Sequence, residues 1–107
     1  MSQRDAFIAI ADSTRREILD LLRANGPMLA GDIAAKFGDA SRPGISRHLR
    51  VLRECGVVAA RKDGKTHVYT LNGKPLVEMR DGWLARFGDM QTASLKALRR
   101  RVKNSND

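Results

Sequence analysis

The fold of this chain is decided by residues 28–71, which read MLAGDIAAKFGDASRPGISRHLRVLRECGVVAARKDGKTHVYTL. Apolar side chains recur at helical spacing over residues 28–37 and again over residues 41–55. A glycine follows each of these segments, as is common where a helix ends. The first part of the stretch therefore predicts two helices joined by a short turn, a helix-turn-helix at residues 28–55.

The second part of the stretch predicts a β-hairpin. The helical spacing of apolar residues stops after Gly56, and two short runs typical of strands follow at residues 57–62 and 65–71, with valines in both and Thr66, Tyr69 and Thr70 in the second. Asp63-Gly64, which separates them, favours a tight two-residue turn. We therefore expect a wing at residues 57–71 with basic residues at its tip.

The rest of the chain completes one domain, because 107 residues are too few for two cores. Apolar spacing predicts short helices over residues 4–11 and 14–24, within an N-terminal part at residues 1–24. A long helix is predicted over residues 75–103, with bends or breaks at Gly82 and Gly88, and residues 104–107 are expected to fray. The predicted fold class is mainly α with a small two-stranded hairpin, a winged helix-turn-helix.

The net charge of +8 is concentrated in the middle and in the last part of the chain. Residues 41–67 contain seven lysines and arginines against two acidic residues. An uneven positive field of this kind attracts a polyanion, and nucleic acid is the usual one. No apolar run is long enough for a membrane span or a signal peptide, so we expect a cytoplasmic protein with no membrane partner.

Catalysis and metal binding are not indicated. Ser46 and His48 are two residues apart on a predicted helix and do not face each other, which is wrong for a nucleophile and its base. Cys55 is the single cysteine, so the chain has no internal disulfide and no thiolate-rich metal site. We therefore predict no enzyme activity, no cofactor and no metal ligands.

The predicted helix at residues 41–55 has one apolar face and one polar face. If Ile45, Leu49 and Leu52 face the core, the 100° step between residues places His48 at the core edge. The residues directed outward are then Pro43, Ser46, Arg47 and Arg50. In a helix-turn-helix the second helix enters the major groove, where arginine can bind guanine. The basic residues of the hairpin, which would contact flanking phosphates or the minor groove, are Arg61, Lys62 and Lys65.

Three stretches resemble the ArsR-type winged-helix repressors. Residues 10–22, IADSTRREILDLL, are similar to the opening of that family, and residues 41–57, SRPGISRHLRVLRECGV, are similar to its recognition-helix pattern. The hairpin resembles its wing. The resemblance places the DNA-reading stretch on Ser41, Arg42, Pro43, Gly44, Ser46, Arg47 and His48. Arg42 and Gly44 stand where the family often has glutamine and alanine or threonine, so base preference does not transfer.

The resemblance also implies a homodimeric repressor that binds an inverted-repeat operator and dimerises through its first and last helices. Residues 29–37 hold no cysteine or histidine and no histidine follows His67, so the chain resembles a branch without the family's metal ligands. The apolar residues predicted to form the dimer interface are Phe7, Ile8, Leu76, Met79, Trp83, Phe87, Met90 and Leu98.

The sequence thus predicts a sequence-specific regulator of transcription whose partners are double-stranded operator DNA and a second copy of the chain. Control of its own gene is part of this hypothesis, and no effector follows from the sequence. Two alternatives stay open. One is an RNA-binding winged helix that uses the same basic surface. The other is a protein-interaction module that uses the C-terminal helix.

Overall fold

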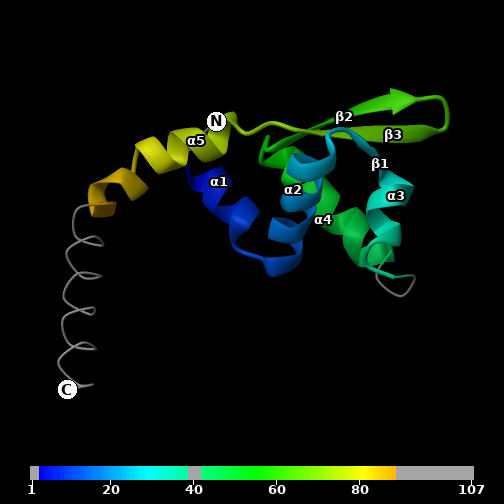
Figure 1. Ribbon diagram of the computed structural model, residues 1–107, viewed down its shortest axis with the longest axis horizontal. Helices are drawn as coiled ribbons and strands as arrows, with labels where there is room; N and C mark the ends of the chain where they lie inside the picture. The colour runs from blue at the N-terminus through cyan, green and yellow to red at the C-terminus, as the bar shows by residue number, and fades with distance from the viewer. Residues whose placement is uncertain (1–2, 39–41, 89–107) are drawn as a thin grey trace, which may run out of the picture.

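The computed structural model describes residues 3–38 and 42–88. Its helices and strands follow the predicted order and confirm a winged helix-turn-helix (Figure 1). Along the chain they are α1 (Gln3–Ile10), α2 (Ser13–Asn25), β1 (Met28–Leu29), α3 (Ala30–Ala35), α4 (Arg42–Glu54), β2 (Val58–Asp63), β3 (Thr66–Leu71), α5 (Lys74–Asp81) and the 3-10 helix η2 (Leu84–Phe87). Within this described part, no helix is long and apolar enough to cross a membrane.

The core lies where α2, α3, α4 and the start of the hairpin meet. The three apolar residues expected on the inner face of α4 are buried, with Ile45, Leu49 and Leu52 exposed by 2%, 3% and 0%. Each such side chain contributes roughly 1.5–3 kcal/mol when it leaves water. The fully buried residues of other elements that pack around them are Ile18, Leu22, Ile33 and Val57. This packing fixes α4 by its inner face and leaves its outer face to solvent.

The sheet has three antiparallel strands in the order β1-β3-β2, one strand more than predicted. Met28 and Leu29, expected at the start of a helix, instead pair with Tyr69 and Val68 of β3. The preceding Pro27 cannot continue α2, and extended backbone here gives β3 a second hydrogen-bonded neighbour. Consequently α3 begins only at Ala30, and it ends at Ala35 rather than at residue 37.

The hairpin turn lies one residue further along than Asp63-Gly64. Asp63 pairs with Thr66, so the two loop residues are Gly64 and Lys65. Gly64 has a φ of +63°, and no residue other than glycine has a positive φ in the described ranges. A positive φ at the first loop position alone is typical of a type II′ turn, which requires glycine there. The turn therefore presents Lys65 at its tip.

The predicted C-terminal helix is divided, as its glycines suggested. α5 ends at Asp81, and after Gly82 the chain continues as η2. α5 packs on α1, and Figure 1 shows these elements at one end of the molecule and the β2-β3 hairpin at the other. The remainder of the predicted helix, including Met90 and Leu98, lies outside the described residues.

Candidate nucleic-acid interface

The outer face of α4 carries the polar and basic residues that the sequence placed there. Pro43, Ser46, Arg47 and Arg50 are exposed, and Gly44 is half-buried. Arg42 is also exposed, whereas Ser41 falls outside the described residues. No acidic residue lies in the first turn of α4, so its positive N-terminal dipole is not offset there. This face can offer arginine, hydroxyl and helix-end donors to a nucleic acid groove.

The hairpin is tied directly to the C-terminal end of α4. The Asn72 side chain donates to the Gly56 carbonyl at 2.9 Å, and the Asn72 backbone N–H donates to the Val57 carbonyl at 2.8 Å. Gly56 adopts a φ of +77° and turns the chain out of the helix. Asn72 thus fixes the wing relative to α4, a role that the hairpin pattern alone did not indicate.

The register of the hairpin separates its basic residues by face. Lys62 lies opposite His67, and Arg61 lies opposite Val68. Because side chains alternate along a strand, Lys62 and His67 share the face that covers the core, while Arg61 projects from the other face. Lys62, His67 and Lys65 are all exposed near the tip. His67, which was not among the predicted contact residues, therefore lies beside the predicted wing residue Lys62.

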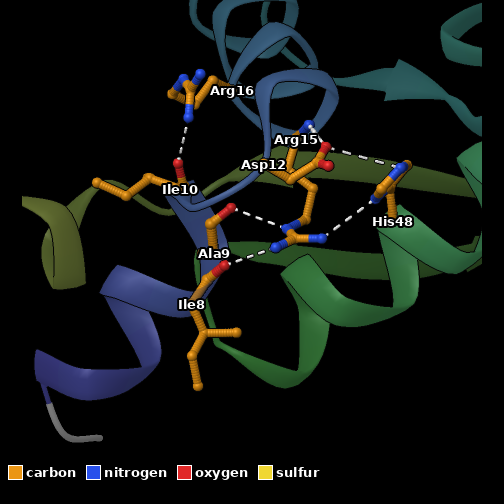
Figure 2. Close-up of polar contacts among 7 residues, drawn as sticks. All are labelled: Ile8, Ala9, Ile10, Asp12, Arg15, Arg16 and His48. Atoms are coloured by element: carbon orange, nitrogen blue, oxygen red, sulfur yellow. Dashed lines mark hydrogen bonds and ion pairs between the residues drawn. The ribbon is translucent and has the colours of Figure 1, made fainter.

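His48 differs from the other residues of the predicted reading stretch because its ring nitrogens face protein partners (Figure 2). Nδ1 lies 3.3 Å from Nη1 of Arg15, and Nε2 lies 3.8 Å from a carboxylate oxygen of Asp12. Arginine has donors only, so Nδ1 accepts this hydrogen bond and the ring proton sits on Nε2, toward Asp12. The same Arg15 donates to the carbonyls of Ile8 and Ala9 at the end of α1.

Asp12 connects this cluster to the start of α2. Its carboxylate caps the helix by accepting the backbone N–H of Arg15 at 3.0 Å. That hydrogen bond is the largest cause of a lowered pKa at Asp12; burial, the second largest, opposes it, and the positive charge of the nearby Arg15 lowers the pKa further. Asp12 therefore remains a carboxylate well into the acid range.

The described residues do not group into a metal or redox centre. No cluster of three histidine, cysteine or acidic side chains that could hold a metal ion occurs within 3–38 and 42–88. Cys55 is 6% exposed, and burial raises the pKa of its thiol. A thiol held protonated in the core is a poor nucleophile.

The predicted dimer residues divide into covered and exposed ones. Met79 is 5% exposed and so is covered within one chain, whereas Leu76 packs against the core but is only partly buried. Phe7 and Phe87 both contact the Trp83 ring, Phe7 edge-on with ring centroids 5.5 Å apart and Phe87 in a tilted arrangement at 4.7 Å. The large apolar residues of this end that stay about two-fifths exposed are Ile8, Val77, Trp83, Leu84 and Phe87. We call these five the apolar end; Val77 and Leu84 were not predicted.

A basic helix face above a buried apolar face, with a hairpin anchored to the same helix, defines a winged helix-turn-helix DNA-binding protein. A family model described as a helix-turn-helix domain matches residues 10–61. The transcriptional repressor SdpR of Bacillus subtilis is 47% identical over 68 residues, which span 64% of this chain and 73% of that protein.

Solved structures agree with the sequence relatives. The crystal structure of a possible transcriptional regulator for arsenical resistance superimposes with a TM-score of 0.74 at 34% identity, over 87% of this chain and 95% of that one. An ArsR-like transcriptional regulator from Rhodococcus sp. RHA1 gives a TM-score of 0.67 at 31% identity, over 92% and 90% of the two chains. The chain belongs to the ArsR family, and it is a DNA-binding regulator of transcription rather than an enzyme.

Proposed function

We propose that this protein is a homodimeric transcriptional repressor that binds an inverted-repeat operator in the cytoplasm, its own promoter included. The observation that carries the proposal is the exposed polar and basic face of α4, opposite the buried Ile45, Leu49 and Leu52. A helix fixed in this way can enter the major groove as a rigid body. The relative SdpR is named a repressor, which supports the direction of regulation.

Within this proposal, residues of α4 read bases and the wing holds the phosphate backbone. Arg47 is the principal reader because a guanidinium can bind guanine O6 and N7 with two hydrogen bonds. Ser46, Arg50, Pro43 and Gly44 line the same approach, with Arg42 at the helix start. Ser41, which lies outside the described residues, is included because of its place in the sequence pattern. On the wing, Lys62, Lys65 and Arg61 contact phosphates, which adds affinity without sequence information.

The two roles predict different losses when the residues are replaced. An operator is first obtained by selecting bound sequences from random duplex DNA. Arg47→Ala should then weaken operator binding about tenfold or more while binding to scrambled duplex changes little, because a lost bidentate contact removes roughly 1–3 kcal/mol of discrimination. The double variant Lys62→Ala, Lys65→Ala should weaken binding to the operator and to scrambled duplex in similar proportion. It should also flatten the slope of log K against log salt by about 1 per lost contact.

Matched controls separate these effects from the loss of positive charge alone. Arg23 is exposed on α2 and pairs only loosely with Asp20 at 3.9 Å, so Arg23→Ala removes one charge away from the proposed interface. Lys74→Ala does the same at the start of α5. Both controls should keep the operator-to-random ratio. If Arg47→Ala also kept that ratio, α4 would not be the reader; tighter binding to RNA than to any duplex DNA would favour the RNA-binding alternative.

A further inference from the structure

One arginine side chain bonds to two elements on either side of its own helix. Arg15, in the first turn of α2, donates through Nη2 to the Ile8 carbonyl at 2.8 Å and through Nε to the Ala9 carbonyl at 3.0 Å. Its remaining terminal nitrogen, Nη1, lies 3.3 Å from Nδ1 of His48 on α4 (Figure 2). A single planar group therefore joins the end of α1 to the proposed reading helix.

The contact between Arg15 and His48 requires one particular orientation of α4 relative to α1. The last carbonyls of a helix lack partners within the helix, and the Arg15 fork supplies donors to two of them at once. The guanidinium is planar, so fixing two of its nitrogens on α1 also fixes where the third points. His48 can accept there only while α4 keeps its present angle to α1. The contact therefore restrains the orientation of α4 relative to α1.

The two elements joined by Arg15 carry different parts of the proposed function. α1 carries Ile8 of the apolar end, and Phe7 stacks edge-on against Trp83 at 5.5 Å. α4 carries the exposed readers. In a two-fold dimer the distance between two reading helices must match half-sites about one DNA turn, roughly 34 Å, apart. Any looseness between α1 and α4 changes that distance twice, once in each protomer.

We propose that Arg15 and His48 form a positioning pair that sets the angle between the dimer surface and the reading helix, and so determines the half-site spacing that the dimer accepts. This inference rests on the proposed dimeric repressor. It gives His48 a role through Arg15 rather than through the bases, and Asp12 holds the other side of the imidazole at 3.8 Å.

A simpler explanation is that Arg15 only stabilises the corner between α1 and α2. The neighbouring residue provides the comparison, since Arg16 donates through Nη1 to the Ile10 carbonyl at 2.7 Å. It bonds to the same corner, carries the same charge and makes its bond away from His48 (Figure 2). Arg16→Ala therefore removes a corner contact and one positive charge but leaves the path to α4 intact.

The test measures binding of the full-length protein to the selected operator and to the same operator with one base pair inserted between its half-sites. For the wild type we expect the insertion to weaken binding about tenfold, because DNA or protein must deform to restore both contacts. Arg15→Ala and His48→Leu should reduce this penalty to about twofold or less. Arg16→Ala should keep it near tenfold. His48→Gln, whose side-chain oxygen can accept from Arg15, should recover most of the penalty.

The spacing penalty is informative because other roles leave it unchanged. A lost base or phosphate contact weakens both duplexes equally, and so does a lost charge. Thermal melting of each variant shows whether it is folded. If Arg15→Ala does not fold, the result for His48→Leu alone tests the inference. His48→Leu is expected to fold because the His48 side chain is 26% exposed, so the Arg15 donor that it leaves can bind water.

The inference is wrong if His48→Leu and any folded Arg15→Ala variant keep the tenfold spacing penalty of the wild type. It is also wrong if Arg16→Ala loses the penalty as completely as Arg15→Ala does. The proposed function fails in a different way. If the wild type itself binds as a monomer, or shows no preference for a spacing, the dimeric operator model is wrong whatever the variants do.

Discussion

The Asp12 carboxylate contacts two groups, the backbone N–H of Arg15 and the imidazole of His48. Its carboxylate caps α2, and chiefly that hydrogen bond holds its pKa below the ordinary value for an aspartate. A group whose pKa is lower in the folded state stabilises the fold above its unfolded pKa. The stabilisation is lost as the pH falls through the folded pKa.

From this we predict an acid-dependent effect of Asp12→Ala. The variant should have a lower Tm than the wild type at pH 7, and the difference should shrink as the pH falls from about 4, the ordinary pKa of an aspartate, through the lowered pKa of the folded carboxylate. Asp12→Asn should keep much of the cap at pH 7, because asparagine is a good N-cap, and should remove most of the acid dependence.

Thermal melts of the three proteins between pH 3 and pH 7 check this prediction. Asp20→Ala is the matched control, since Asp20 makes only an exposed ion pair with Arg23 and should change the Tm little at any pH. An Asp12→Ala difference that stays constant into strong acid would show that the carboxylate charge is not what stabilises the cap.

The residues of this cluster illustrate what one sequence can reveal. The sequence Asp12-Ser13-Thr14 is itself typical of a helix N-cap, because a cap acts within a few residues. The contact between Arg15 and His48 could not be predicted from the sequence, because the two residues are 33 positions apart and only the packing of α2 against α4 brings them together. Helical spacing placed His48 at the core edge correctly, but spacing cannot identify what fills that edge.

At the scale of elements, two of the differences from expectation share one cause. The strand β1 and the position of the hairpin turn both depend on pairing with β3. Periodicity measures one segment at a time, so it found β2, β3 and α4 but could not show that Met28 would gain a partner in Tyr69. The break at Gly82, by contrast, is local, and the sequence indicated it.

The turn geometry predicts opposite effects for two glycine replacements. Gly64→Ala should destabilise the fold by about 1 kcal/mol or more, because an alanine must adopt the φ of +63°. Gly44→Ala, in the first turn of α4, should stabilise it by about 0.5 kcal/mol, because alanine restricts the unfolded chain. A β-carbon added at either site meets no atom within 4 Å, so packing does not enter.

Urea denaturation at one fixed protein concentration measures both effects, with an unchanged m value as evidence that only stability has altered. A Gly64→Ala variant as stable as the wild type would show that Gly64 does not need its left-handed conformation. The hairpin turn would then have to be assigned again.

At the scale of the whole molecule, the wing and the apolar end lie at opposite ends (Figure 1). Apolar spacing in the C-terminal segment indicated an interface but could not separate Met79, which faces the chain's own core, from Val77, which does not. That distinction needs the position of α1 against α5. An apolar surface of this kind, carried by three short elements, usually marks a site of association.

We therefore predict that the protein is a dimer through the apolar end, and that charge placed there dissociates it. Ile8→Glu and Phe87→Glu should each raise the dimer dissociation constant roughly a hundredfold, because each would bury an unpaired carboxylate in the interface. Leu29→Glu is the matched control: Leu29 is 38% exposed, close to Ile8 at 43% and Phe87 at 41%, but lies on β1 away from α5. Sedimentation velocity at micromolar concentration should show dimers for the wild type and Leu29→Glu, and monomers for the other two. A monomeric wild type would contradict the dimer, and dimeric Ile8→Glu and Phe87→Glu variants would place its interface elsewhere on the chain.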